Sequence, residues 1–408
     1  MSSILIKNIG ELATAKGNTA KKGAEQGEIS ILKNVCIGIT NEKISYIGEE
    51  KNAPKSEVEI DAKGNLVTAG LVDSHTHLVF GGWRQNELAL KLQGATYLEI
   101  LKSGGGILST VNSTRKAEPE ELAQKTKLLL DEMLSYGTTT CEAKSGYGLS
   151  LQDELKQLQV LENLKATSEM EIVSTFMGAH AVPPEFKENR EEYIELICTE
   201  MIPTVAKKEL AEYCDIFCET GVFTVDESRK ILQTAKQHGF KLKIHADEIN
   251  CIGAADLASE VVAASAEHLI EASDDGIKKM SKSETIAVLL PATSFYLDKT
   301  YARARKMLEE GMSVAVATDF NPGSSPNLNL QLAMNLACLK YKLTPAEVLT
   351  AVTLNAAAAI GKSSTVGTLE VGKQADIVIW NAQDLNYILY RYGSNLVKSV
   401  IKKGRIAY

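Results

Sequence analysis

Two histidines one residue apart are the strongest chemical signal in the sequence. His75 and His77 stand in LVTAGLVDSHTH, at the end of a run of apolar residues. Side chains two positions apart in a strand point to the same side, so these two imidazoles can share one metal ion. An isolated HxH pattern is more often a pair of satisfied core histidines. The positions of the other histidines therefore decide between the two interpretations.

Five of the six histidines fall at the ends of predicted strands, whereas His238 falls on a predicted helix. The five are His75, His77, His180, His245 and His268. The carboxyl ends of all strands in a closed parallel barrel open onto one face, where residues distant in the sequence meet. We therefore expect these histidines to gather in one barrel mouth.

A metal site follows from two further residues at strand ends. His245 lies in KLKIHADE, and Asp319 lies in VAVATDF. With His75 and His77 they give three imidazoles and a carboxylate, a set that suits zinc, or iron as an alternative, and leaves a position for water. Capping is the alternative role for Asp319, but it does not explain a carboxylate at the end of a buried strand. We expect one divalent or trivalent metal ion per subunit at these four residues.

Groups for proton transfer lie close to that set. Glu248 follows His245 by three residues, and His268 ends the next strand, SAEHL. The structural alternatives are a helix N-terminal acid and a core imidazole. Beside a metal-activated water, Glu248, His268 and Asp319 can supply the proton transfers that hydrolysis of a stable C–N bond needs. We predict these three as catalytic groups, with the choice of general base left open.

Candidate substrate contacts lie in the loops after the strands. Arg84 follows Gly81 and Gly82, and its guanidinium can hold a substrate carboxylate by two hydrogen bonds. Packing is the more common role for an aromatic at helical spacing such as Tyr97, and turn chemistry is an equal alternative for the loop after Asp319. The predicted substrate-binding residues are Arg84, Tyr97, Tyr147, His180, Glu248, Asn321, Gly323 and Ser324.

The elements that must position these residues alternate between strand and helix. Predicted strands cover 66–77, 137–144, 171–180, 214–220, 241–248, 265–269, 285–291 and 313–320. Helical patterns such as 120–135 and 225–238 separate most neighbours. The LSTV run near Leu108 is either a ninth strand or, as its Gly-rich entrance favours, the approach to a helix. Eight such units favour an α/β fold of the (β/α)8 TIM-barrel type over a doubly wound sheet.

The two ends of the chain differ from the middle in their pattern of residues. Residues 1–65 and 360–408 contain short β-type runs separated by turn residues. Neither end is long enough to build a comfortable core alone. We expect them to pair into one small β-sandwich, a discontinuous domain of 1–65 plus 360–408 beside a barrel of 66–359.

Composition excludes several classes of protein. The 408 residues are 44% hydrophobic and 24% charged, which excludes a disordered or collagen-like chain. A net charge of −8 disfavours nucleic acid as a partner. The seven cysteines form no CxxC pair, and no signal-like or membrane-spanning apolar stretch is present. We therefore expect a cytoplasmic protein without a membrane or nucleic-acid partner.

The strings GLVDSHTH, HADE, SAEHL and ATDFNPG together resemble the metal-dependent amidohydrolase superfamily. Barrels of that superfamily present HxH on strand 1, histidines on strands 5 and 6, and aspartate on strand 8. No lysine ends the strand on which binuclear members carry a carbamylated bridging lysine. The resemblance thus implies a member with one metal ion.

Longer strings over residues 70–327, among them FGGWRQNELALKLQGATYLEI, TTTCEAKSGYGL and STFMGAHAVPPEF, narrow the resemblance. They are similar to members that hydrolyse 4-imidazolone-5-propanoate to N-formimidoyl-L-glutamate in histidine degradation. This implies a small-molecule substrate, the metal and substrate residues named above, and a homodimer. Two alternatives are an aminohydrolase acting on a cyclic amidine such as cytosine, and a barrel kept as a non-catalytic scaffold. The scaffold is disfavoured because the whole ligand set is retained.

Overall fold

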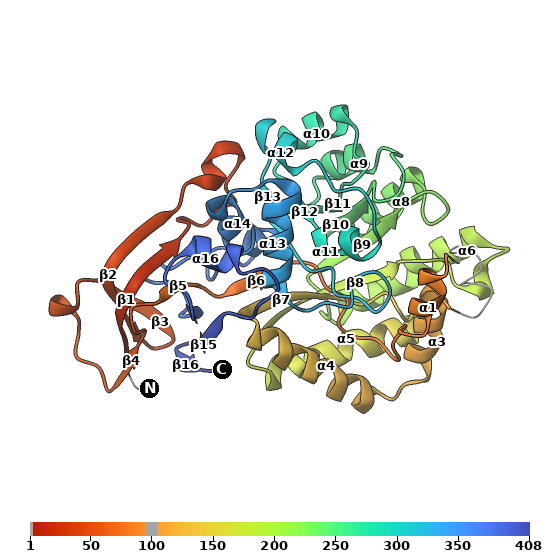
Figure 1. Cartoon of the computed structure of the whole chain (residues 1–408). Helices are drawn as coiled ribbons and strands as arrows, with labels where there is room; N and C mark the ends of the chain where they lie inside the picture. The colour runs from red at the N-terminus through yellow and green to blue at the C-terminus, as the bar shows by residue number, and fades with distance from the viewer. Residues whose placement is uncertain (1–2, 95–104) are drawn as a thin grey trace.

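The computed structural model describes residues 3–94 and 105–408, which form two eight-stranded sheets (Figure 1). The first sheet is parallel throughout, with its strands paired in chain order. Its strands are β6 (Leu71–Asp73), β7 (Thr138–Lys144), β8 (Glu171–Ala179), β9 (Tyr213–Cys218), β10 (Lys241–Ala246), β11 (Ser265–His268), β12 (Ile286–Leu289) and β13 (Val314–Val316).

The two outer strands of this sheet meet just beyond their carboxyl ends. Thr76 bridges Phe320 in a parallel pair, and the backbone N–H of Asp319 donates to the carbonyl of His75 at 3.1 Å. The sheet is therefore a nearly closed barrel, which confirms the predicted (β/α)8 architecture. Every residue of β7 is buried, as expected for a strand covered on both faces.

Helices connect the barrel strands and cover them from outside (Figure 1). In α4, Pro119 occupies the first turn, and Leu122, Leu129 and Met133 form a buried stripe against the sheet. The LSTV run belongs to a helix, so the helical interpretation is confirmed. No helix in the described ranges is long and apolar enough to cross a membrane. The α-helices are α1 (Glu87–Leu92), α3 (Ile107–Lys116), α4 (Pro119–Ser135), α5 (Leu151–Thr167), α6 (Arg190–Leu196), α7 (Ile202–Lys207), α8 (Val225–Gln237), α9 (Ala254–Val261), α10 (Asp274–Ser281), α11 (Pro291–Tyr296), α12 (Ala304–Glu309), α13 (Leu330–Tyr341), α14 (Pro345–Ala351), α15 (Leu354–Ala359) and α16 (Leu385–Tyr390).

The second sheet joins both ends of the chain. N-terminal and C-terminal strands meet where β5 pairs antiparallel with β14, and the two termini lie on the same side of the molecule (Figure 1). The predicted association of the two ends is confirmed. Hydrogen bonds link all of their strands into one sheet, rather than into the two sheets of a sandwich. The predicted domain boundaries stay a prediction. The strands are β1 (Ile4–Thr14), β2 (Ser30–Thr40), β3 (Lys43–Gly48), β4 (Val58–Asp61), β5 (Leu66–Ala69), β14 (Ile377–Trp380), β15 (Val397–Lys402) and β16 (Arg405–Ile406).

Strand β14 separates two apolar cores. Ile377 and Ile379 pack into the cluster of the terminal sheet, whereas Val378 and Trp380 pack into the large cluster that includes the barrel helices. This alternation is the period of two that a strand imposes. Strand β14 is thus apolar on both faces and helps to hold the terminal sheet and the barrel together.

The single strand predicted over 66–77 is wrong in one respect, because the chain changes sheet within it. Residues of β5 belong to the terminal sheet, and β6 begins the barrel after Gly70. A side chain at Gly70 would place its Cβ 2.2 Å from Thr139 Oγ1, so glycine is needed at this crossing. Both sheets bury their apolar residues, and the hydrophobic pattern therefore carries no mark of the change.

Candidate metal centre and active site

The predicted site residues converge on a cavity of about 610 Å³ at the barrel mouth. His75 lies fully buried against Asp319 at its base. Tyr97 falls outside the described residues, so its predicted role stays untested. The predicted residues that line the cavity are His77, Arg84, Tyr147, His180, His245, Glu248, His268, Asp319, Asn321, Gly323 and Ser324.

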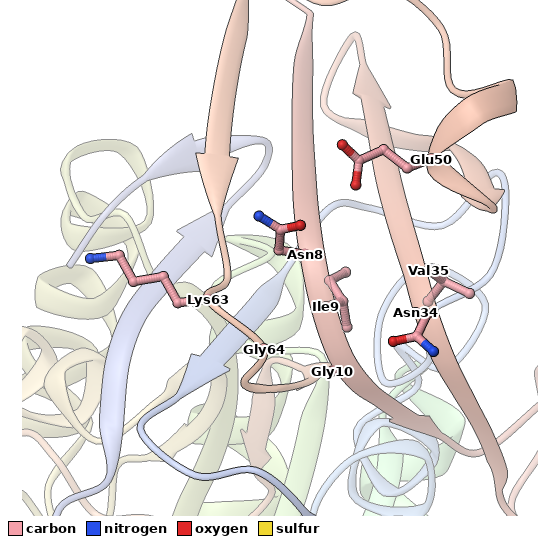
Figure 2. A pocket seen from close by; sticks show the side chains of 8 residues that line it. All are labelled: Asn8, Ile9, Gly10, Asn34, Val35, Glu50, Lys63 and Gly64. Carbon is pink, nitrogen blue, oxygen red and sulfur yellow. The ribbon is translucent and has the colours of Figure 1, made fainter.

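A second cavity, of about 340 Å³, lies in the terminal sheet (Figure 2). It is lined by Asn8, Ile9, Gly10, Asn34, Val35, Glu50, Lys63 and Gly64. This lining contains no histidine or cysteine and only one carboxylate. Of these two cavities, the one at the barrel mouth is therefore the candidate active site.

The four predicted metal ligands come together in space. Asp319 Oδ1 lies 3.3 Å from His75 Nε2 and 3.7 Å from His77 Nε2. One ring nitrogen from each of His75, His77 and His245 lies within 4.8 Å of the other two. Ligand atoms of His268, His75 and Asp319 also lie within 4.8 Å of one another. The two clusters share His75, so together they offer five possible ligands, which are His75, His77, His245, His268 and Asp319.

The donor set fits a metal ion. Both ring nitrogens of His75 and Nδ1 of His77 are buried and have no hydrogen-bond partner among the described residues. A buried polar atom without a partner is costly, and a bound cation that accepts its lone pair removes this cost. Burial also lowers the pKa of His75 and His77 well below the ordinary value. Both rings are therefore neutral, as metal ligation requires.

Asp319 is held by its backbone and by a hydroxyl. Its φ of 53° lies in the left-handed region, which is uncommon for a residue other than glycine. Thr293 Oγ1 donates to Asp319 Oδ2 at 2.6 Å, while Oδ1 faces the histidines. Burial raises the pKa of Asp319 to about 6. Local strain at a strand end is a common feature of functional sites.

His245 differs from the other predicted ligands because a carboxylate supports its ring. Its Nδ1 lies 3.2 Å from Asp215 Oδ1, and Asp215 Oδ2 lies 2.7 Å from Lys144 Nζ. Burial opposes the charged imidazole, but Asp215 outweighs burial and raises the pKa of His245. Sequence reasoning missed Asp215 and Lys144. The available signal was the presence of charged residues in both of the predicted strands CDIFCET and TTTCEAK.

Glu248 and His268 face each other across the site. Glu248 Oε2 lies 3.6 Å from His268 Nε2. Burial, followed by the charge of Asp319, raises the pKa of Glu248 to about 8. The carboxyl can therefore carry a proton near neutral pH. Glu219 fixes the adjoining loop by accepting the backbone N–H groups of Ile249 and Asn250.

Arg84 lines the cavity but is already paired. Its Nε and Nη2 each donate to a carboxylate oxygen of Glu87 at 2.8 Å. Sequence reasoning missed Glu87, which begins α1 three residues after Arg84. A Cβ on Gly323 would lie 2.1 Å from Arg84 Nη1. Only glycine at 323 allows the guanidinium to approach this closely.

Tyr147 and His180 form an aromatic wall beside the ligands. The rings of His180 and His77 are stacked, with centroids 5.1 Å apart and planes inclined by 20°. His180 Nδ1 lies 3.0 Å from the carbonyl of Gly146, which makes Nδ1 the donor and Nε2 the acceptor. Burial lowers the pKa of His180 to about 3 and raises that of Tyr147. The wall therefore offers neutral groups to a ligand.

The loop after Asp319 is ordered by its own hydrogen bonds. Asn321 Oδ1 accepts from the backbone N–H groups of Gly323 and Ser324, both at 2.8 Å. Asn321 Nδ2 donates to the carbonyl of Asp319 at 2.7 Å. The turn chemistry considered for this loop is thus present. Contact of these residues with substrate stays a prediction.

Comparison with known proteins gives concordant findings. The profile of the amidohydrolase family matches residues 66–407. Over 410 residues the chain is 52% identical to the imidazolonepropionase of Alkaliphilus oremlandii (strain OhILAs), covering 99% of this chain and 97% of the relative. It is 50% identical over 412 residues to the imidazolonepropionase of Bacillus cereus (strain G9842), covering 100% of this chain and 97% of that relative.

Solved structures share the fold at low sequence identity. A zinc-bound adenosine deaminase from Xanthomonas campestris matches with a TM-score of 0.72 at 19% identity, over 99% of this chain and 92% of that one. The guanine deaminase of E. coli matches with a TM-score of 0.76 at 14% identity, over 100% and 99%. These neighbours support the barrel with its terminal sheet.

Proposed function

The chain belongs to the amidohydrolase family, among the imidazolonepropionases, and from this premise we propose how its residues open the imidazolone ring. The reaction is hydrolysis of the cyclic amide C–N bond of 4-imidazolone-5-propanoate to N-formimidoyl-L-glutamate. The observation that carries the proposal is the convergence of three imidazoles and one carboxylate at the cavity, with Glu248, whose pKa burial raises to about 8, beside them.

His75, His77, His245 and Asp319 hold the metal ion in this proposal, and the ion is zinc, with iron as the alternative. Both metals accept imidazole and carboxylate ligands. When bound, the ion supplies Lewis acidity that lowers the pKa of a water toward about 7 and polarises the ring carbonyl. Elemental analysis of the purified protein identifies the metal, and we expect about one equivalent per chain.

His268 and Asp319 orient the attacking water and take its proton. His268 ends β11, Asp319 follows β13, and both share a cluster with His75. A base must lie within hydrogen-bond reach of the proton that it removes. Water then adds to the amide carbon of the ring.

Glu248 delivers a proton to the ring nitrogen. The raised pKa of about 8 keeps its carboxyl protonated at neutral pH, and His268 lies 3.6 Å away as a proton relay. Protonation of the nitrogen makes it a better leaving group, so the C–N bond breaks. The attacked carbon becomes the new carboxylate of the product.

Arg84 and Tyr147 hold the propanoate tail. Both line the cavity, and the guanidinium is the cation suited to a bidentate carboxylate contact. Arg84 is engaged by Glu87 in the present structure, so substrate carboxylate must compete with Glu87 or use the remaining N–H groups. His180 and the Asn321 loop complete the pocket around the ring.

The test is loss of ultraviolet absorbance of freshly generated imidazolone propanoate, measured with the wild type and with Arg84→Ala. We expect turnover by the wild type and a raised KM in the variant. Without turnover by metal-loaded protein the assignment fails, and release of ammonia from cytosine-like substrates then indicates a deaminase. Arg84→Lys is the control, because lysine keeps the positive charge but lacks the planar guanidinium.

Two properties complete the proposal. We propose a homodimer, which light scattering at several concentrations tests; a mass of one chain throughout would contradict it.

We also propose a cytoplasmic location. The seven cysteines are all unpaired in the structure, and five of them are buried, as a reducing compartment allows. The net charge and the composition also predict that neither nucleic acid nor a membrane is a partner.

A further inference from the structure

The barrel interior carries a buried ionic cluster that the proposed mechanism does not use. Lys144 Nζ lies 2.6 Å from Glu142 Oε1 and 2.7 Å from Asp215 Oδ2. All three side chains are fully buried. Removal of charges from water is expensive, and buried ion pairs add stability only when the geometry compensates for it. A cluster of this kind at the base of a metal site therefore calls for a functional explanation.

One arm of the cluster reaches the metal ligand His245. Asp215 Oδ1 lies 3.2 Å from Nδ1 of that ring. A carboxylate only accepts hydrogen bonds, so Nδ1 must carry the proton, and the lone pair of Nε2 is left for a metal. The described neighbours offer no such partner to Nδ1 of His75 or His77.

The other arm fixes the backbone between the first two ligands. Thr76 stands between His75 and His77, and its backbone N–H donates to Glu142 Oε2 at 3.3 Å. Thr76 Oγ1 donates to the Glu142 carbonyl at 2.6 Å, and the Lys144 N–H donates to the Thr76 carbonyl at 2.9 Å. Strand β7 thus holds the HxH segment while Lys144 reaches across to Asp215 on β9.

Charge gives an independent reason to connect the cluster with the metal. It contains two carboxylates, Glu142 and Asp215, and one ammonium, Lys144, so one negative charge is left unbalanced. A cation bound by His245 would lie near Asp215, which contacts the same ring, and would offset that charge. The cluster and the metal would therefore stabilise each other.

We propose that Asp215 and Lys144 are positioning residues of the metal site. Asp215 fixes the tautomer of His245 that presents Nε2, and Lys144 holds Asp215 in the orientation that this requires. The inference rests on the metal site of the proposed function. It does not depend on the identity of the substrate, because its readouts are metal affinity and the position of a proton.

The experiment compares zinc retention by four proteins: the wild type, Asp215→Asn, Lys144→Met and Lys402→Met. Lys402 is the matched control, since it is also a buried lysine, paired with Asp376 at 2.6 Å, but lies in the terminal sheet. Competition against a chelator should show zinc affinity lowered about 10- to 100-fold in the first two variants, the usual effect of losing a partner behind a ligand. Lys402→Met should keep wild-type affinity while losing thermal stability.

A second readout uses the zinc-loaded wild type and does not require any variant to fold. Long-range proton–nitrogen correlation with 15N-labelled histidine should show His245 with a hydrogen-bonded proton on Nδ1 and zinc on Nε2. Zinc on Nδ1 would overturn the proposal. Zinc affinities of Asp215→Asn and Lys144→Met equal to that of Lys402→Met would also overturn it and make the cluster purely structural. Absence of imidazolone turnover would contradict the proposed function alone.

Discussion

Glu248 shows at the scale of one residue how position changes chemistry. An exposed glutamate has a pKa near 4.3 and is ionised at neutral pH. Burial in the barrel mouth beside Asp319 raises the pKa of Glu248 to about 8. The same carboxyl thereby becomes an acid of the strength that the proposed protonation of the leaving nitrogen needs.

Replacement of Glu248 by glutamine removes this proton while preserving the size of the side chain. We expect kcat to fall by at least about 10²-fold, the usual contribution of a general acid, with the metal retained. Steady-state kinetics and metal analysis of the same preparation measure both. Glu162→Gln, on the partly exposed face of α5, is the control. Unchanged turnover in Glu248→Gln would remove that residue from the mechanism.

At the scale of one element, α8 shows how local sequence fixes the spacing between barrel strands. Thr224 and Glu227 form a capping box at its start, in which each side chain bonds to the backbone N–H of the other. Arg190 adds two hydrogen bonds to the carboxylate of Glu227. The helix therefore begins at one defined residue between β9, which carries Asp215, and β10, which carries His245.

Loss of this cap should affect stability and leave catalysis intact. Thr224→Ala should reduce the free energy of unfolding by about 1 kcal/mol, the usual value for an N-cap. Urea denaturation measures the change, and Thr234→Ala in the same helix is the control. A tenfold loss of kcat in Thr224→Ala would contradict the purely structural role.

The pH dependence of the same interaction has a definite sign. The hydrogen bond from Arg190 lowers the pKa of Glu227 below its ordinary value of 4.5. A carboxyl whose pKa is depressed by folding stabilises the protein above its unfolded pKa, and this contribution is lost as the pH falls through the folded value. Glu227→Gln should thus be destabilised relative to the wild type at pH 7, and the difference should shrink below about pH 4.5. Urea denaturation at several pH values measures it; a difference that is constant with pH would contradict the assignment.

At the scale of the whole molecule, β14 couples the terminal sheet to the barrel. Trp380 is fully buried in the barrel-side cluster, and its indole N–H donates to Thr68 Oγ1 at 2.9 Å. Trp380→Ala should cost about 3–5 kcal/mol through the cavity that it leaves. Trp380→Phe keeps most of the apolar volume and should cost less. Equal losses in chemical denaturation would show that packing at this position is unimportant.

Metal removal also acts on the whole molecule, because the ligands come from residues 75 to 319 of the chain. A ligand that binds only the folded state stabilises it by about 2.7 kcal/mol at a concentration of 100 times Kd. Chelator-treated protein should therefore have a lower Tm, and zinc should restore it. Thermal unfolding with and without chelator measures the shift, with magnesium as the control cation. An unchanged Tm in metal-free protein would contradict a site built from distant strands.

The sequence by itself determined the barrel and the pairing of the two ends, and it predicted the residues that meet in the candidate metal cluster. Strand and helix periodicities are local, and His75, His77, His245 and Asp319 each stand where an apolar run ends. The resemblance to a known superfamily rested on the same strings. These properties depend on short segments of the chain, so the sequence alone predicts them.

Only the tertiary structure decided which side chains support the site. Asp215 and Glu142 lie inside buried strands, and their contacts with His245 and Thr76 span 30 and 66 residues of the chain, so spacing alone does not reveal them. The change of sheet at Gly70 was hidden because both sheets bury apolar side chains. Such contacts are set by the packing of distant strands, which the local pattern of residues does not record.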